Sequence, residues 1–207
     1  NIGRKEQMPE IRINNKVLVT QTGAAEPVLA SNVNLGSATF PAGHIIQTVQ
    51  HVFTGTASIS SVSTDSFASF NIPFSKGITP FLSSSKILVS VNISLGHDAG
   101  SIHTAIYRDG TKLTGAAGDV AGNRFGSTTL SRYANPAYGF GCNSMSFNYL
   151  DSPTIPTTPI EIVYEIKATL GASYNDGIYL NHSASDSTNM DYTPRTASFM
   201  TLFEIAQ

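Results

Sequence analysis

The stretch 160-IEIVYEIKATL-170 decides the fold class of this chain. All of its even-numbered positions carry apolar residues, whereas Glu161, Glu165 and Lys167 occupy odd-numbered ones. Successive side chains of a β-strand point to opposite faces, so a period of two predicts a strand with one buried and one solvated face. The preceding segment 151–159 contains three prolines, which a helix interior would not tolerate. We therefore place a core β-strand at 160–170.

Similar strand patterns recur along the chain from residue 41 onward. The predicted strands cover residues 44–53, 67–74, 85–95, 102–108, 112–113, 128–133, 144–150, 178–180 and 198–205. Asp109-Gly110 is a strong hairpin signal between two of them, and the Gly- and Ala-rich segment 114–126 predicts a long surface loop. No segment has a sustained helical period. The sequence thus predicts an all-β head domain over residues 41–207, an antiparallel β-sandwich of jelly-roll type.

Residues 1–40 differ in character and predict an extended N-terminal shaft or linker segment. Apolar and polar residues alternate on both sides of Asn14-Asn15, which indicates a short hairpin or two shaft-like strands. The rest of the segment has no apolar block large enough for a core. We expect it to be stable only as one of several intertwined copies, and the alternative is a disordered linker. The chain does not begin with Met, and we interpret it as a piece of a longer protein.

Composition argues against several classes of partner. Charged residues make up 13% of the 207 residues, about half the usual share, and the formal net charge is −2. Lys and Arg do not cluster, so we expect neither nucleic acid nor an anionic membrane as a partner. The chain has no apolar run long enough to span a bilayer, so we expect no membrane insertion. Its single cysteine, Cys142, has no partner for an internal disulfide.

Two of the predicted strands, 45–53 and 199–205, are apolar on both faces. A strand in a monomeric sandwich buries one face, so its second face should be polar. Either these strands are central in an arrangement of three layers, or their outer faces meet copies of the same chain. Because few surface charges oppose association, we favour a homo-oligomer.

Three segments carry a family resemblance. They are PAGHIIQTVQHVF (41–53), TPFLSSSKILVSVNISLG (79–96) and AIYRDGTKL (105–113). Together they resemble the fibre-head, or knob, domains of phage tail fibres and related virion proteins, of the type found in phages of marine bacteria and cyanobacteria. The matching residues are Pro41, Gly43, Ile45, Thr79, Pro80, Ser84, Ser85, Lys86, Ile87, Leu88, Val89, Arg108, Asp109, Gly110 and Thr111. The resemblance covers residues 41–113, and the final strand also fits this family.

The resemblance implies a homotrimeric head domain in the tail or fibre of a virion, outside the host cell at attachment. Its expected partners are a host cell-surface polysaccharide or envelope protein, and other virion proteins through the N-terminal segment. It implies no enzymatic activity. One alternative is a structural head-fibre or decoration protein without a host ligand. Another is a free carbohydrate-binding module, or a free trimeric signalling module similar to C1q and tumour necrosis factor.

The residues that bear chemistry do not form a recognisable catalytic motif. Cys142 has no base near it in the sequence, and His97, Asp98 and His103 alone would not complete a metal site. We expect no catalytic residue, no metal and no cofactor. Carboxylates could in principle hydrolyse glycosides as a pair. The candidates for such a pair are Asp151, Glu161 and Glu165.

Binding chemistry is better supplied, because aromatic faces and Asn or Asp side chains hold saccharides. The candidate ligand-binding residues are Tyr133, Tyr138, Tyr174, Asn175, Asp176, Tyr192 and Arg195. All of them lie in predicted loops with polar neighbours. For the segment 174–177, an ordinary hairpin turn explains the same residues equally well.

Overall fold

The computed structural model describes residues 10–13, 16–20, 28–29, 40–60, 66–97, 100–132, 141–158, 160–171, 177–186, 188 and 193–207. The chain forms two compact units, Asn1–Thr39 and Phe40–Gln207. In the first unit, β1 (Glu10–Ile13), β2 (Lys16–Thr20) and β3 (Val28–Leu29) form a three-stranded sheet in that order. β1 and β2 pair antiparallel, with Glu10 opposite Thr20, as in the hairpin alternative for this segment.

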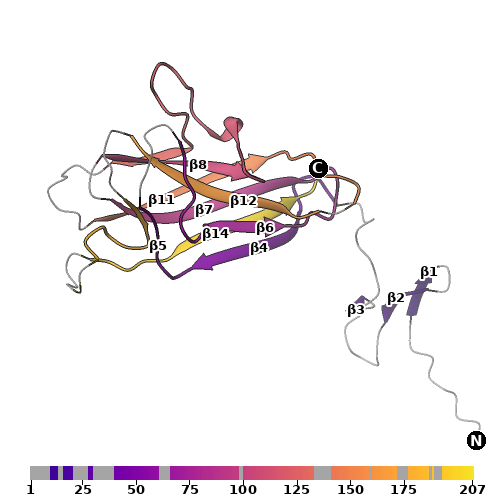
Figure 1. Cartoon of the computed structure of the whole chain (residues 1–207). Helices are drawn as coiled ribbons and strands as arrows, with labels where there is room; N and C mark the ends of the chain where they lie inside the picture. The colour runs from indigo at the N-terminus through magenta and orange to yellow at the C-terminus, as the bar shows by residue number, and fades with distance from the viewer. Residues whose placement is uncertain are drawn as a thin grey trace, which may run out of the picture. The chain divides into compact units, whose positions relative to one another are not determined.

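The second unit is a sandwich of two antiparallel sheets, so the predicted all-β sandwich is confirmed. A six-stranded sheet contains β4 (Ile45–Phe53), β14 (Ser198–Ile205), β7 (Lys86–His97), β13 (Ile178–Leu180), β5 (Ala57–Ile59) and β11 (Cys142–Asp151). A five-stranded sheet contains β10 (Thr129–Arg132), β8 (Ser101–Arg108), β12 (Ile162–Leu170), β6 (Ser75–Ile78) and β9 (Thr111–Lys112). Figure 1 shows the long strands of both sheets running along the length of the sandwich.

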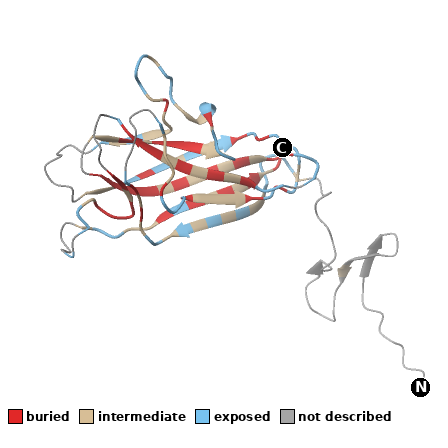
Figure 2. Ribbon diagram, viewed as in Figure 1, coloured by how far each residue is buried: buried red, intermediate tan, exposed pale blue. Residues whose placement is uncertain are grey.

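The core lies between the sheets and follows the period of two. On β7, alternate residues from Ile87 to Leu95 are at most 3% exposed, and they face the row that runs from Ile162 to Leu170 on β12. The resulting alternation of buried and partly exposed residues is visible along both strands (Figure 2). Ile160, predicted in the same row, is 51% exposed, so that prediction is wrong. The ladder of β12 with β6 begins only at Ile162, so Ile160 precedes the paired part of the chain.

The predicted strand at 67–74 is also wrong. In this segment the backbone makes one isolated bridge, Ala68 to Ala168, and the strand β6 begins only after it. The Asn71 side chain accepts hydrogen bonds from the backbone N–H groups of Ser58 and Ile72, which stabilises an irregular conformation. Phe70 and Phe74 are nevertheless buried, so the apolar pattern predicted burial correctly and secondary structure incorrectly.

The hairpin signal is confirmed. Asp109 and Gly110 join β8 to β9 with φ values of 48° and 78°, the left-handed conformations that a two-residue hairpin turn of type I′ requires. The Asp109 side chain also accepts a hydrogen bond of 2.8 Å from the Val163 N–H.

The chain enters and leaves the sandwich at one end. Gly43 N–H donates to the Ala206 carbonyl, and Ala206 N–H donates to the His44 carbonyl, each at 2.9 Å. We call this the entry end; β4 starts and β14 finishes there (Figure 1). At the far end, β7 finishes at His97 and β8 starts at Ser101.

Candidate functional site

A pocket of about 290 Å³ lies on the outer face of the five-stranded sheet, near the far end. The side chains of His103 and Leu130 come from β8 and β10, where the two residues are cross-strand partners. The other lining residues are Asp119, Asn123, Arg124, Phe125, Ser127 and Gly171. Most of them belong to the segment 114–128, most of which (114–126) the sequence predicted as a surface loop. The structure places this segment over the outer face of β8.

Backbone contacts hold this loop in place. Gly118 N–H donates to the Ser127 carbonyl at 2.9 Å and closes the loop on itself, and Thr128 N–H donates to the Thr104 carbonyl at 2.7 Å. Gly122 turns the tip with a φ of 62°, a conformation that favours glycine. The pocket wall is therefore fixed by hydrogen bonds to its own backbone and to β8.

Aromatic and cationic side chains pack beneath the loop. The Phe67 ring lies 6.4 Å from that of Tyr107 and 6.3 Å from that of Phe125, measured between ring centroids. Lys112 Nζ lies 4.4 Å from the Phe67 centroid, and Lys167 Nζ lies 4.7 Å from the Tyr107 centroid. The contact between Phe67 and Phe125 packs the loop on this cluster, and the two cation–π contacts stabilise the Phe67 and Tyr107 rings beneath it.

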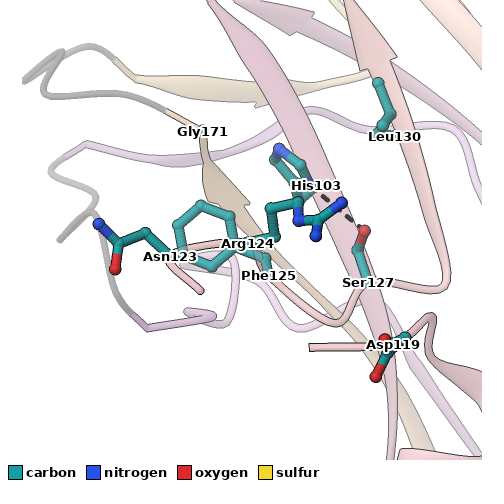
Figure 3. Close-up of a pocket in the computed structure, with 8 residues that line it drawn as sticks. All are labelled: His103, Asp119, Asn123, Arg124, Phe125, Ser127, Leu130 and Gly171. Carbon is teal, nitrogen blue, oxygen red and sulfur yellow. Dashed lines mark hydrogen bonds between the residues drawn. The ribbon is translucent and has the colours of Figure 1, made fainter. Parts of the chain in front are cut away.

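His103 lies at the base of the pocket. Its Nδ1 shares a hydrogen bond of 3.2 Å with Ser127 Oγ, and its ring lies 5.1 Å from that of Phe125 (Figure 3). A Cβ atom at Gly171 would lie 2.6 Å from His103 Nε2, so only glycine leaves room for the ring here. Burial lowers the pKa of His103, which favours the neutral imidazole.

The rim of the pocket is polar and open to solvent. Asp119, Asn123 and Arg124 are all exposed. Arg124 Nε donates to the Ala121 carbonyl at 3.0 Å, which fixes the base of its guanidinium. In the described part of the chain, Arg124 and Asp119 make no ion pair. Figure 3 shows the lining residues, with Arg124 and Phe125 drawn beside the hydrogen-bonded pair of His103 and Ser127.

Acid unfolding tests the burial of His103. Its pKa is lowered in the folded state, so below about pH 6.5 the unfolded chain binds more protons and the free energy of unfolding falls. We expect the wild-type protein to have a lower free energy of unfolding at about pH 5 than at about pH 8. The His103→Gln variant should show a smaller difference between the two pH values, as measured by urea unfolding. Asn123→Ala, at a pocket residue that does not titrate, should keep the full difference. A His103→Gln variant with the wild-type difference would contradict this account.

Most of the predicted ligand-binding residues lie outside the described residues. These are Tyr133, Tyr138, Tyr174, Asn175, Asp176 and Tyr192. Arg195 is described and exposed, and it pairs with Asp186 at 2.6 Å. His182 Nδ1 lies 3.9 Å from the same Asp186 oxygen. Arg195 is not among the residues that line the pocket. The sequence prediction missed the pocket, and its only signals were the long loop and His103.

The carboxylates considered for glycoside hydrolysis have other partners or positions. Asp151 is 4% exposed, and it accepts hydrogen bonds from Arg108 at 2.6 Å and from the Tyr164 hydroxyl at 2.7 Å. Glu165 Oε2 lies 3.7 Å from Lys167 Nζ on the outer face of β12. The side chain of Glu161 lies beside Gly77, where a Cβ atom would meet it at 2.2 Å. None of the three lines the pocket.

A second surface of interest is the outer face of β4, β14, β7 and β11, which we call the uncharged face. Cross-strand partners on it include Val52 with Phe199, and Leu88 with Phe203 and Leu150. Its most exposed apolar residues are Ile45 at 50%, Val52 at 48%, Leu150 at 47% and Phe199 at 38%. In the paired rows of this face, Lys86 is the one charged residue. Both faces of β4 and β14 therefore do carry apolar side chains, as the sequence indicated.

No protein-family profile matches the chain, and no curated protein is similar to it in sequence. Within the described residues, no group of three or more His, Cys, Asp or Glu side chains is arranged to hold a metal ion. The part of the chain that the structure describes also contains no helix with the length and apolar content needed to cross a membrane.

Proposed function

We propose that this chain is a non-enzymatic, homotrimeric head domain of a phage fibre, which attaches the virion to a polysaccharide or envelope protein on the host surface. The observation that carries the proposal is the uncharged face of the six-stranded sheet. The resemblance of residues 41–113 to fibre-head domains supplies the virion context. The trimeric state follows from that resemblance, whereas association through this face follows from its chemistry.

The apolar part of the uncharged face favours association. Val52 and Phe199 lie side by side on neighbouring strands, and each exposes more than a third of its surface. Contiguous apolar patches on a protein surface mark interaction sites more often than isolated residues do. Interface cores are also depleted in charged residues, as this face is.

The polar part of the same face is suited to burial. Gln50 Nε2 donates to Thr201 Oγ1 at 3.0 Å, and Asn92 Nδ2 donates to Ser146 Oγ at 2.7 Å. Burying a polar group costs little when its hydrogen bonds are already made within the protein. Each pair satisfies one donor and one acceptor within the protein, which lowers the cost of burying these side chains in an interface between copies.

The position of the pocket agrees with a role in attachment. It lies near the far end of the sandwich, since Gly171 N–H donates to Ser101 at the start of β8. The chain enters the sandwich at the opposite end, beside Ala206. A head held by its entry end presents its far end outward, and this is where a fibre meets its receptor.

The oligomeric state tests the proposal. Light scattering or sedimentation of the full chain should give three times the 22.0 kDa mass of one copy. Phe199→Lys should reduce the mass to that of a single chain, because association would then bury a charge without a partner. Ile72→Lys is the matched control: Ile72 is 48% exposed and lies outside the uncharged face, so the trimer should persist. A wild-type chain that stays monomeric at high concentration would refute the proposal.

A further inference from the structure

We infer that the pocket beneath the 114–128 loop binds one neutral pyranose ring of a glycan. That this glycan belongs to the host surface rests on the proposed function, whereas the ring-sized site rests on the pocket itself. The argument uses the size of the pocket, the chemistry of its wall and its balance of charge.

The size of the pocket sets the size of the ligand. Its volume of about 290 Å³ is at the lower end of ligand pockets, which span roughly 300–1,000 Å³. A space of this size accepts a single six-membered ring with its hydroxyl groups. A longer oligosaccharide would have only one of its units inside the pocket, with its other units lying across the rim.

The wall of the pocket alternates apolar and hydrogen-bonding groups. Phe125 and Leu130 supply apolar surface, and Leu130 is 53% exposed although it is a large aliphatic residue. Asp119 and Asn123 supply an acceptor and a mixed donor and acceptor. A pyranose ring has the complementary surface, because its C–H groups form apolar patches and its hydroxyls both donate and accept.

The polar groups of the rim are available to a ligand. Within the described residues, the side chains of Asp119 and Asn123 make no hydrogen bond to protein. The guanidinium of Arg124 uses Nε for the Ala121 carbonyl, and its two terminal nitrogens make no hydrogen bond to any other described residue. Because the loop backbone is already fixed, little ordering is required when a ligand binds.

The charge of the lining indicates a neutral sugar. Asp119 contributes one negative charge and Arg124 one positive charge, and burial lowers the pKa of His103, which favours its neutral form. The pocket therefore has no net charge with which to select an anion or a cation. A uronic acid would gain from Arg124 but would be repelled by Asp119.

The experiment is a ligand-observed NMR titration of the full chain with methyl glycosides. The probes are the glucoside, galactoside and mannoside, N-acetylglucosamine as a further neutral sugar, and glucuronic acid as the charged one. We expect at least one neutral pyranose to show saturable binding and to be preferred over glucuronic acid. Neutral pyranoses that all fail to bind, or a preference for glucuronic acid, would overturn the inference.

Variants locate the bound ring. Arg124→Ala and Leu130→Ser each change an exposed lining residue, so the fold should survive, and each should weaken binding by about tenfold or more. Ile160→Ser removes an aliphatic side chain of similar exposure from outside the pocket and should leave the affinity unchanged. Wild-type affinity in both pocket variants would place the sugar elsewhere and overturn the inference.

Failure of the inference and failure of the proposed function give different results. A trimer that binds sugar equally well without Arg124 and Leu130 retains the attachment role but loses this site. A trimer that binds no neutral sugar also loses this site. A monomer that binds a neutral pyranose through these residues retains the site and refutes the fibre-head proposal.

Discussion

Replacing Glu204 by Ala will destabilise the sandwich by about 4 kcal/mol, because four hydrogen-bond donors then lose their acceptor. Glu204 has no exposed surface. It lies on β14, the last strand in the sequence, which is placed between β4 and β7 in the six-stranded sheet. One of its oxygens accepts from Ser85 Oγ at 2.7 Å and from Leu82 N–H at 3.0 Å. The other accepts from Gln47 Nε2 at 2.7 Å, and Phe81 N–H reaches both.

These contacts explain the TPFLSSS segment at 79–85 in physical terms. The segment forms a turn between β6 and β7. The N–H groups of Phe81 and Leu82 in this turn donate to the carboxylate of Glu204, which lies near the C-terminus. Gln47 joins the same network, because its Nε2 also donates to the Thr79 carbonyl at 2.7 Å. Glu204 thus ties the turn, β4 and β14 together at the entry end of the sandwich.

Glu204→Gln is the matched control for Glu204→Ala. The amide keeps the shape and one acceptor oxygen, which can still serve Ser85 and Leu82. Its NH₂ group would face Gln47 Nε2, donor against donor, so we expect a loss of about 1–2 kcal/mol in place of about 4 kcal/mol. Chemical denaturation of the full chain measures both losses. Equal losses in the two variants would show that the carboxylate does not organise the turn.

Replacing Asp151 by Ala will destabilise the protein by about 3 kcal/mol, the lower part of the range for breaking a buried ion pair. Asp151 belongs to β11 of the six-stranded sheet, whereas its partners Arg108 and Tyr164 belong to β8 and β12 of the five-stranded sheet. Without the carboxylate, the hydroxyl of the fully buried Tyr164 has no acceptor. Arg108 is less affected, because 30% of its side chain is exposed and can be hydrated.

Tyr164→Phe separates the two contacts of Asp151. The variant removes a hydroxyl whose pKa is raised, first by burial and then by the hydrogen bond to Asp151, and it retains the Arg108–Asp151 pair. We expect a loss of about 1 kcal/mol, the usual value of a single hydrogen bond. Thermal and denaturant unfolding of the two variants measure the difference. A loss from Tyr164→Phe as large as that from Asp151→Ala would assign the whole effect to the Tyr164 hydroxyl and leave no contribution for the Arg108–Asp151 pair.

Strict periodicity made the long strands predictable. The alternation along 162–170 and 87–95 allows only one choice of buried face, because a shift of the strand by one residue would turn the whole apolar row to solvent. The pattern of the segment 67–74 predicts a strand because the segment carries the core residues Phe70 and Phe74. Its actual conformation depends on the Asn71 side chain reaching Ser58, a contact between distant residues that the pattern does not contain.

The candidate site was not predictable for the same reason. His103 and Leu130 meet through the register of β8 and β10, and Phe125 reaches them only because the loop folds back over the sheet. Nothing in the order of these residues along the chain indicates that they line one pocket. Glu204 is similar, since all four of its donors lie more than a hundred residues away in the sequence, and Gln47 of β4 lies 157 residues away.

The hydrogen bonds between Gly43 and Ala206, and between Ala206 and His44, have a consequence for engineering. Because residues 43–44 and 206 are hydrogen-bonded neighbours, the two ends of the head domain lie close together. The domain can therefore be joined to a host protein at a single insertion point. It can be inserted as a cassette into a surface loop of an unrelated scaffold without stretching either junction. The pocket would then face away from the scaffold, displayed at the opposite tip.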